Sequence, residues 1–176
     1  MARVFGRSGS LSSTPIFKGQ LNYTEPHIPT PEDIIPQMLR MASVKPDELV
    51  YDLGSGDGRL VIAAARDFGA RAVGVELRMR LVKECRRKVR EMGLGGRVTI
   101  TSKNFKRVSL RKADVLALYL SSYTLNLLTP KFTKELRSGV RIVNFDYPVP
   151  AWKPTREVEV TPAGWKKPHP IYLYQV

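Results

Sequence analysis

The most informative segment of the chain covers residues 49–59 and reads Leu49-Val50-Tyr51-Asp52-Leu53-Gly54-Ser55-Gly56-Asp57-Gly58-Arg59. An apolar strand runs into three alternate glycines, and a helix follows them. Glycine is required where the backbone turns with a positive φ angle and where it approaches a ligand without a Cβ atom in the way. The pattern therefore predicts a loop between strand and helix that holds a cofactor.

An acidic residue further along the chain narrows the cofactor to a nucleoside. Glu76 ends the next predicted strand, 20 residues after Gly56, where a carboxylate accepts hydrogen bonds from ribose hydroxyls. A dinucleotide-binding loop needs a third glycine three residues after Gly56, but this chain has Arg59 there. Asp52 and Asp57 would also repel a pyrophosphate. S-adenosylmethionine fits these residues, because it carries an α-ammonium and a sulfonium but no phosphate.

The adenine ring of such a cofactor needs a further contact after the third predicted strand. Asn104 and Phe105 follow that strand. The amide oxygen of Asn104 can accept a hydrogen bond from the exocyclic amine, and the ring of Phe105 can stack on the base. The residues predicted from these patterns to bind the cofactor are Asp52, Gly54, Ser55, Gly56, Asp57, Glu76, Asn104 and Phe105.

Strand-like and helix-like segments alternate through the rest of the chain. The predicted strands are Leu49–Leu53, Ala72–Glu76, Arg97–Ser102, Asp114–Leu120 and Val140–Asp146. The predicted helices between them are Arg59–Phe68, Arg78–Met92 and Ser122–Arg137, the last with a break at Pro130. Glu157–Thr161 and Ile171–Gln175 predict a closing hairpin. These segments predict an α/β, Rossmann-like fold with a mostly parallel sheet and an antiparallel terminal hairpin.

The N-terminal region divides into two parts. Residues 1–24 contain 3 basic and no acidic residues and show neither a strand nor a helix period, which predicts a flexible basic tail before one domain of residues 25–176. Thr30 followed by Pro31 predicts the start of a helix, because a hydroxyl can cap it and proline suits its first position. Pro36 lies deep in that pattern, which indicates a kink or a later start.

Composition excludes several classes of protein. The chain has 176 residues, of which 43% are hydrophobic, so it is long enough to form one domain with a sizeable core. The longest apolar run, Val115–Leu120, is far short of the ~20 residues of a membrane span. A single cysteine, Cys85, cannot form an internal disulfide, and with 2 histidines no metal site is expected. We therefore expect a cytoplasmic protein with no membrane or metal partner.

The net charge of +13 indicates a polyanionic partner or, equally, a basic solvated surface. Residues 78–112 contain 13 basic and 2 acidic residues, so the excess is concentrated there. Lysine and arginine beside an edge strand also guard against sheet-to-sheet aggregation. We expect this segment to dock acidic or nucleic-acid-associated proteins, with Arg86, Arg87 and Lys88 as its representatives, and direct nucleic-acid binding stays open.

The acceptor of the methyl group is expected at the carboxyl ends of the fourth and fifth strands. The fourth strand is followed by Ser121-Ser122 rather than the Asx-Pro-Pro-aromatic motif of amino-adenine methyltransferases. A cytosine-C5 methyltransferase would need a nucleophilic cysteine on a loop, but Cys85 is expected to face the core. Methylation of either nucleobase is therefore disfavoured. The residues predicted to act at this site are Tyr119, Asp146, Tyr147 and Trp152. The three aromatic residues either form a channel or are packing residues.

Several motifs together resemble one known family. They are Pro26-His27-Ile28-Pro29-Thr30-Pro31, Tyr51–Arg59, Gly74-Val75-Glu76, Asn104-Phe105, Asn144–Tyr147 with Trp152 and Pro154, and Tyr172-Leu173-Tyr174. The chain from Pro26 onward is similar to the archaeal broad-specificity protein lysine methyltransferases, seven-β-strand enzymes of class I related to the non-SET histone lysine methyltransferases. The resemblance implies the strand order 3-2-1-4-5-7-6, and it implies that Thr30 closes over the methionine end of S-adenosylmethionine. Family members can carry His-Glu after the fifth strand, whereas this chain has Phe145-Asp146.

The resemblance implies in-line methyl transfer to a neutral lysine amine. Presenting a neutral amine at pH 7 costs about 4–5 kcal/mol, given a lysine pKa of ~10.4, and desolvation between aromatic rings beside a sulfonium lowers that cost. The expected partners are protein substrates with exposed lysines, and the substrate range is expected to be broad. The enzyme is expected to be a monomer. Two alternatives remain: an RNA methyltransferase, and a nucleic-acid-binding module without catalysis on the same fold.

Overall fold

The computed structural model describes residues 27–176, so the predicted tail of residues 1–24 lies outside the described residues. The helices are α1 (Ile35–Met41), α2 (Arg59–Phe68), α3 (Met79–Glu91) and α4 (Ser122–Glu135), with a 3-10 turn at Phe105–Arg107. The strands are β1 (Leu49–Leu53), β2 (Arg71–Val75), β3 (Val98–Thr101), β4 (Val115–Leu118), β5 (Arg141–Phe145), β6 (Arg156–Val160) and β7 (His169–Gln175). Within residues 27–176, none of the helices has both the length and the apolar character needed to cross a membrane.

The seven strands form one sheet in the order β3-β2-β1-β4-β5-β7-β6. β1 pairs in parallel with β2 and β4, while β5 pairs in parallel with β4 and antiparallel with β7. This confirms both the predicted strand order and the antiparallel terminal hairpin. The chain reverses its winding direction beside β1, so the carboxyl ends of β1 and β4 border the crevice where ligands bind in such folds.

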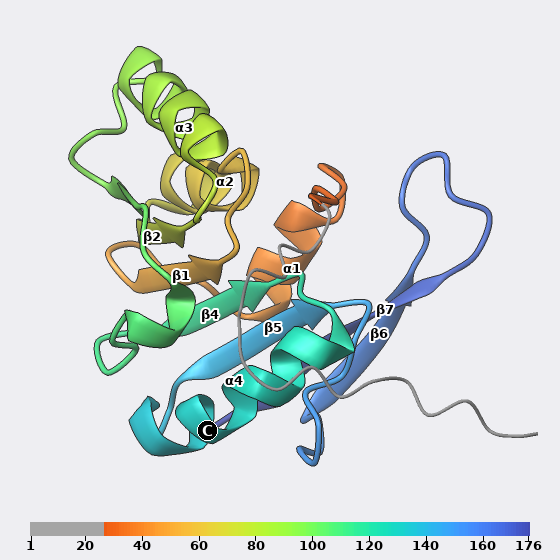
Figure 1. The fold of residues 1–176 in the computed structure, drawn as a ribbon. Coiled ribbons are helices and arrows are strands. Elements are labelled where there is room, and N and C mark those ends of the chain that lie inside the picture. Colours follow the sequence, from red (N-terminus) through yellow and green to blue (C-terminus); the bar gives the residue numbers. More distant parts are fainter. Residues whose placement is uncertain (1–26) are drawn as a thin grey trace, which may run out of the picture.

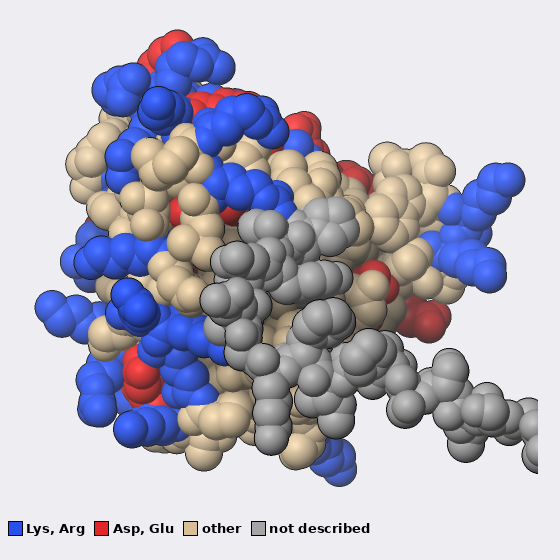
Figure 2. All heavy atoms as spheres, viewed as in Figure 1, with Lys and Arg blue, Asp and Glu red and all other residues tan. Residues whose placement is uncertain are grey.

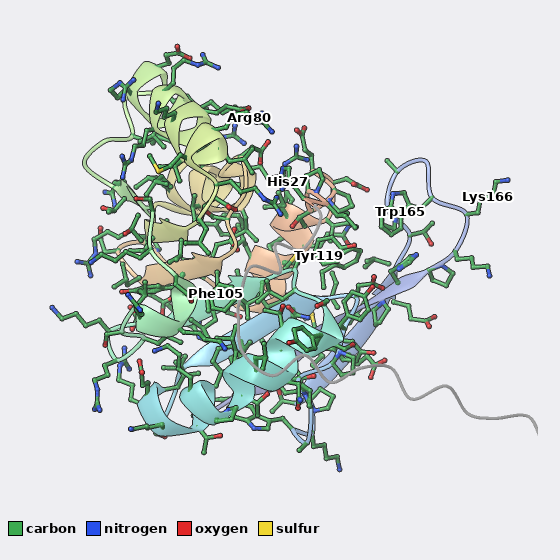
Figure 3. The ribbon with its side chains drawn as sticks, in the orientation of Figure 1. His27, Arg80, Phe105, Tyr119, Trp165 and Lys166 are labelled. Carbon is green, nitrogen blue, oxygen red and sulfur yellow. The ribbon has the colours of Figure 1, made fainter. Side chains whose placement is uncertain are left out.

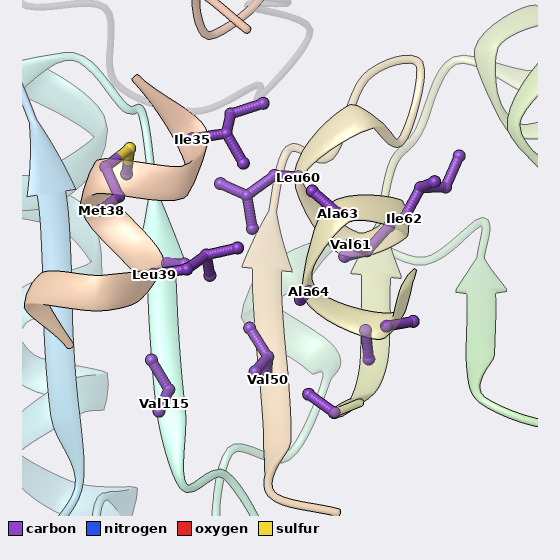
Figure 4. Close-up of a cluster of buried hydrophobic side chains, with 14 of the residues drawn as sticks. Ile35, Met38, Leu39, Val50, Leu60, Val61, Ile62, Ala63, Ala64 and Val115 are labelled. Atoms are coloured by element: carbon purple, nitrogen blue, oxygen red, sulfur yellow. The ribbon is translucent and has the colours of Figure 1, made fainter. Parts of the chain in front are cut away.

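Helices cover both faces of the sheet, which gives a three-layered molecule (Figure 1). The first core cluster packs α1, α2 and α3 on one face, and its contacts around Val50 and Val115 are shown in Figure 4. The second cluster packs α4 on the other face, with Leu128 and Phe132 fully buried. Neighbouring residues of a strand alternate between the clusters, because successive side chains point to opposite faces. Cys85 is fully buried in the first cluster, as predicted.

Helix α1 begins at Ile35, so the prediction of a helix start at Thr30 is wrong and the alternative of a later start is confirmed. The chain first makes a turn in which the Ile34 amide donates to the Pro31 carbonyl. Pro36 then lies in the first turn of the helix, where its missing N–H has no intrahelical partner to lose. Thr30 is consequently released from capping and lies buried beside the glycine loop.

Helix α4 continues through Pro130, so the predicted break there is wrong. Proline removes one hydrogen bond to the carbonyl four residues earlier, here that of Asn126. Asn126 and Pro130 are both exposed, and water can solvate the freed carbonyl. Leu128 and Phe132 are fully buried on the opposite side, and this packing keeps the helix continuous.

Candidate functional site

The glycine loop turns tightly between β1 and α2. Gly54, Gly56 and Gly58 have φ angles of +88°, +54° and +83°, in the left-handed region that favours glycine. The amides of Gly54 and Ser55 both donate to the carbonyl of Val75, which ties the loop to the end of β2. A Cβ atom on Gly58 would lie 1.9 Å from Cys85 Sγ. Gly58 is therefore required for the close packing of α3 as well as for the turn.

Glu76 holds the loop in place from the end of β2. Its Oε2 accepts a hydrogen bond from the Gly56 amide at 3.0 Å, and its Oε1 accepts one from the Arg78 amide at 2.8 Å. The carboxylate is buried, and each of its oxygens retains a lone pair. The arrangement places a fixed acceptor at the position predicted for ribose.

The two aspartates of the loop have opposite electrostatic environments. Burial, together with the nearby charges of Glu76 and Asp57, raises the pKa of Asp52 to about 8. Burial also acts to raise the pKa of Asp57, but hydrogen bonds and charge from Arg59, with Lys88, outweigh that effect and leave it at about 2. A cationic ligand would therefore stabilise the ionised form of Asp52, whereas Asp57 is already paired with Arg59 and Lys88.

Arg59, where a dinucleotide loop has glycine, joins the loop to the preceding segment. Its guanidinium donates to Asp57 Oδ2 at 3.0 Å and to the Thr30 carbonyl at 3.1 Å, and Lys88 of α3 reaches the same Asp57 oxygen at 3.3 Å. The sequence pattern indicates only that Arg59 replaces the third glycine of a dinucleotide-binding loop, and it predicts that Asp57 binds the cofactor. The structure instead shows Asp57 engaged in an ion-pair network.

A recess of about 320 Å³, measured with the solvent at its mouth, opens beside the loop. Figure 3 shows His27 and Tyr119 near the carboxyl ends of the central strands, and both contribute to its walls. The other lining residues are Ile28, Pro29, Thr30, Asp52, Gly54, Ser55, Asp57, Arg59 and Leu60.

The recess has polar groups that lack partners within the described part of the chain. Ser55 Oγ is buried and makes no hydrogen bond to a described residue. Asp52 has an elevated pKa because it is buried with two other acids. A ligand with a positive charge would relieve the condition at Asp52. The donor set therefore fits the methionine and ribose parts of S-adenosylmethionine.

Asn104 and Phe105 lie where the chain leaves β3, as predicted. Asn104 Oδ1 accepts a hydrogen bond from the Lys106 amide at 2.9 Å and so caps the 3-10 turn. Phe105 is half-buried and packs against the second core cluster. If Asn104 Oδ1 also accepts a hydrogen bond from adenine, as predicted, it must do so while accepting the one from the Lys106 amide.

At the other end of the recess, aromatic rings continue from Tyr119 towards β7. The Tyr119 ring lies edge-on to Phe145, with centroids 5.0 Å apart, and Phe145 lies 6.1 Å from both Trp165 and His169. Burial raises the pKa of Tyr119 to about 12, with contributions from the nearby Asp146 and Tyr147. The structure thus brings the predicted residues Tyr119, Asp146 and Tyr147 together.

Trp152 lies elsewhere, so the packing alternative holds for this ring and it does not join Tyr119 in a channel. Its ring packs edge-on against Tyr174, at 6.3 Å, and belongs to the cluster on the α4 face. Tyr119 packs against the cluster on the opposite face. The sequence could not place Trp152, because it lies in the irregular segment after β5, where no period of two or 3.6 residues indicates a face.

Asp146 occupies a strained turn at the end of β5. Its φ angle is +74°, and the Tyr147 amide donates to the Phe145 carbonyl across it, the pattern of a γ-turn. Asn144, fully buried, donates through Nδ2 to the carbonyls of Phe145 and Tyr147 and stabilises this turn. Non-glycine residues keep such a conformation only when the surrounding structure enforces it, and they concentrate at functional sites.

Two residues of this region were not predicted from the sequence. His169 Nδ1 lies 2.7 Å from Asp146 Oδ1, and the ring of Trp165 stands edge-on to the His169 ring at 4.5 Å. Both come from the β6–β7 hairpin, far along the chain from β5. Only the antiparallel pairing of Phe145 with Ile171 could have indicated that His169 lies near Asp146, and this pairing follows from the predicted sheet rather than from a local motif.

Basic residues gather over α3 and the β3 edge of the sheet (Figure 2). The three residues chosen to represent this flank are, however, engaged in the fold. Arg86 donates to the Ile100 carbonyl of β3, Arg87 pairs with Glu91, and Lys88 pairs with Glu84 and Asp57. Basic side chains of this flank that make no ion pair with a described residue include Lys83, Arg90, Lys103, Arg107 and Lys112.

Comparison with known proteins agrees with this geometry. Residues 52–156 match the family model described as the ANTKMT methyltransferase domain. A protein-lysine N-methyltransferase of Saccharolobus islandicus is 37% identical over 152 residues, which cover 86% of this chain and 93% of that protein. The adenine nucleotide translocase lysine N-methyltransferase of Mus musculus is 35% identical, over 74% of this chain and 57% of its own length.

Among solved structures, an RNA methyltransferase of Salinibacter ruber in complex with S-adenosyl-L-homocysteine is similar, with a TM-score of 0.78 and 34% identity over 84% of this chain and 93% of that one. Its ligand agrees with the predicted cofactor. The matches confirm the predicted seven-strand methyltransferase fold and the resemblance to lysine methyltransferases. The chain belongs to the family of the ANTKMT methyltransferase domain.

Proposed function

We propose that the protein is an S-adenosylmethionine-dependent protein-lysine N-methyltransferase. The observation that carries the proposal is the Asp146 carboxylate placed near Tyr119, a residue that lines the recess. Aromatic walls beside one carboxylate suit an amine that arrives as a cation and reacts as a neutral group. The protein-lysine methyltransferase of Saccharolobus islandicus, which aligns over most of this chain, supports the same acceptor.

The chain's own residues would bind and orient the cofactor, which supplies an electrophilic methyl group when bound. Asp52 offers a buried carboxylate for its positive charge, and Glu76 offers acceptors for ribose hydroxyls. Thr30 would close over the methionine end, where Arg59 holds its carbonyl. Gly54, Ser55 and Gly56 would line the cofactor, and Asn104 with Phe105 would contact adenine.

At the acceptor side, Tyr119 and Tyr147 would flank the incoming amine. Tyr119 stays protonated at neutral pH because its pKa is raised to about 12, so it can donate a hydrogen bond but cannot take a proton. Asp146 would attract the incoming ammonium. Asp146→Ala is therefore expected to reduce turnover more than cofactor affinity.

RNA methylation is the second candidate, because the similar structure from Salinibacter ruber is that of an RNA methyltransferase. The basic flank formed by Lys83, Arg90, Lys103, Arg107 and Lys112 would suit RNA as well as acidic proteins. After β4, however, the chain reads Tyr119-Leu120-Ser121-Ser122, without the Asx-Pro-Pro-aromatic motif of amino-adenine chemistry. We therefore favour lysine as the acceptor.

The experiment that separates the two adds radiolabelled S-adenosylmethionine and the purified protein to a cell extract. Parallel samples are then digested with protease or nuclease, and a protein hydrolysate is analysed for methyl-lysine. Label that is released by protease and co-migrates with methyl-lysine supports the proposal. Label that disappears only with nuclease would establish RNA as the acceptor in its place.

We also propose that the basic flank docks acidic or nucleic-acid-associated protein substrates. It lies on the β3 edge, at the opposite end of the sheet from the β6–β7 hairpin. A substrate bound there would be held by charge while its lysine enters elsewhere. The broad substrate range, the monomeric state and the cytoplasmic location expected from the sequence stay predictions.

A further inference from the structure

His169 and Asp146 form a hydrogen-bonded pair at the acceptor side. Asp146 Oδ1 lies 2.7 Å from His169 Nδ1, and the Asp146 amide donates to the carbonyl of Pro170 at 2.8 Å. Two contacts from neighbouring strands therefore fix the histidine ring relative to the turn. When the Asp146 carboxylate is the acceptor of this bond, Nδ1 is its donor, and Nε2 of a neutral ring is then the free acceptor.

The pair remains open to a ligand. The side chains of His169 and Asp146 are 27% and 17% exposed, in contrast to the fully buried Phe145 beside them. His169 Nε2 has no hydrogen-bond partner among the described residues and is not enclosed. Asp146 presents this carboxylate from a left-handed conformation, with a φ angle of +74°, of the kind that concentrates at functional sites.

The pair also lies near the recess, because the charge of Asp146 acts on the phenol of Tyr119, which lines the recess. Phe145 is 6.1 Å from the His169 ring and 5.0 Å from Tyr119, which lines the recess. Trp165 closes the side of the β6–β7 loop and packs on His169, whereas Lys166 points away from the molecule (Figure 3). The amide of Ala163 in this loop donates to Asp33 Oδ2, which ties the loop to the segment that follows Thr30.

The other titratable groups around His169 are poor proton acceptors for an ammonium at neutral pH. Tyr119, after β4, stays protonated because its pKa is raised to about 12, and burial with the charges of Glu157 and Asp146 also raises the pKa of Tyr172 on β7. Glu159 on β6 and the loop residues Lys166 and Lys167 are exposed to solvent. Among side chains, imidazole is the one whose charge changes between pH 5 and 8.

From this geometry we propose that His169, positioned by Asp146, accepts the proton of the incoming lysine ammonium. This inference rests on the proposed lysine methyltransferase function. In the step, one N–H bond of the ammonium breaks, its proton bonds to Nε2, and the electron pair stays on the amine nitrogen. The neutral amine then reacts beside Tyr119, and the imidazolium, stabilised by Asp146, releases its proton to water. His169 thus supplies the histidine that the Phe145-Asp146 sequence lacks after β5.

The test compares His169→Gln with the wild type, using poly-L-lysine as the acceptor and labelled S-adenosylmethionine as the donor. Glutamine can still donate to Asp146 but cannot take up a proton. We expect kcat at pH 7 to fall about 100-fold, within the usual range for a lost general base, and the deficit to shrink as pH approaches that of amine deprotonation. Glu159→Gln, on the exposed side of the same hairpin, is the matched control and should match the wild type.

A second acceptor makes the test specific. A peptide in which lysine is replaced by its less basic thia analogue should react with a smaller difference between His169→Gln and the wild type, because less free energy is needed to remove its proton. Unchanged S-adenosylhomocysteine affinity in His169→Gln verifies that the fold and the recess are intact. A deficit equal at every pH and for both acceptors would show a structural role and overturn the inference.

The outcomes also separate this inference from the proposed function. If the wild type methylates poly-L-lysine and His169→Gln does so equally well at pH 7, the role of His169 is refuted and the lysine methyltransferase function stands. If the wild type transfers label to nucleic acid in the extract but not to poly-L-lysine, the proposed function fails and the inference fails with it.

Discussion

The two halves of the site are built in different ways. The cofactor half consists of the glycine loop after β1 and Glu76 after β2, joined by a hydrogen bond between residues 20 positions apart. The acceptor half joins Asp146 after β5 to His169 on the antiparallel strand β7, with Trp165 from the intervening loop. The first half depends on backbone geometry at glycines, whereas the second depends on side chains that meet only when the hairpin packs.

Carboxylates illustrate the difference. Asp52 lies between other acids in the cofactor half, where its pKa is raised to about 8, so this half is electrostatically unsatisfied until a cation binds. Asp146 already has His169 as a partner. We infer that substitutions which change the charge or the backbone of the cofactor half should strongly reduce cofactor affinity or stability. Substitutions in and around the acceptor half should have smaller effects on stability. The following predictions test this contrast.

The largest effect is expected for Gly58→Ala. The φ angle of +83° disfavours a Cβ atom, and that atom would lie 1.9 Å from Cys85 Sγ on α3. Backbone strain and overpacking together should lower the free energy of unfolding by about 3 kcal/mol, measured by denaturant titration. Gly93→Ala is the control, because Gly93 has a φ of +68° but a Cβ atom there would have open space within 4 Å, and it should cost about 1 kcal/mol. Equal losses would contradict the packing argument.

Asp52→Asn should weaken the binding of S-adenosylmethionine about 100-fold, or about 2.7 kcal/mol. The reason is that the amide keeps the shape of the buried carboxyl but removes the charge that faces the cationic ligand. Isothermal titration calorimetry at pH 9 measures the loss. Glu157→Gln, an exposed acid of β6, is the control and should bind normally. Normal affinity in Asp52→Asn would exclude this residue from the cofactor half.

The raised pKa of Asp52 predicts a dependence of cofactor affinity on pH. Below about pH 8 the free protein carries this carboxyl protonated, so affinity for S-adenosylmethionine should fall by up to tenfold per pH unit, and Asp52→Asn should lose that slope. In the unliganded protein, folding stability depends on pH in the opposite direction from cofactor affinity. The folded state binds more protons than the unfolded state between about pH 4 and pH 8, so this group lowers stability as pH rises through that range. Calorimetry and thermal unfolding at several pH values measure both, and a flat affinity profile would refute the assignment.

On β7, the strand that also carries His169, Tyr174→Phe should cost about 1–2 kcal/mol of stability. The Val149 amide donates to the Tyr174 hydroxyl at 2.8 Å, and without that oxygen a buried N–H has no acceptor. Cofactor affinity should not change, because this contact lies on the α4 face, away from the recess. Tyr172→Phe provides the comparison on the same strand and should be nearly neutral. An equal effect of Tyr174→Phe on cofactor binding would show that the two halves are coupled.

The smallest effect is expected on the basic flank. Replacing Lys103, Arg107 and Lys112 by glutamate should raise the KM for protein substrates several-fold at low salt and reduce its salt dependence, with kcat and cofactor affinity unchanged. The residues make no ion pair within the described chain, so stability should stay within about 0.5 kcal/mol of the wild type. An unchanged KM at low salt would remove the flank from substrate docking.

Much of the fold could be predicted because its signals are local. Short apolar strands bounded by glycines and amphipathic helices predicted the strands within about two residues of their observed limits, and the terminal pair as a hairpin. The two errors, at Thr30 and Pro130, arose where tertiary packing outweighed a local preference. Pro36 moved the start of α1, and the burial of Leu128 and Phe132 carried α4 through a proline.

The sequence by itself determined the cofactor half, because left-handed glycines and an acid at a set spacing are properties of neighbouring residues. Only the tertiary structure decided which loop aspartate is neutralised, since Arg59 and Lys88 reach Asp57 and leave Asp52 buried among acids. It also decided the acceptor half, moving Trp152 to the α4 face and bringing His169 to Asp146. The physical reason is that an antiparallel partner strand brings together side chains 23 residues apart, and no local period in the chain encodes that contact.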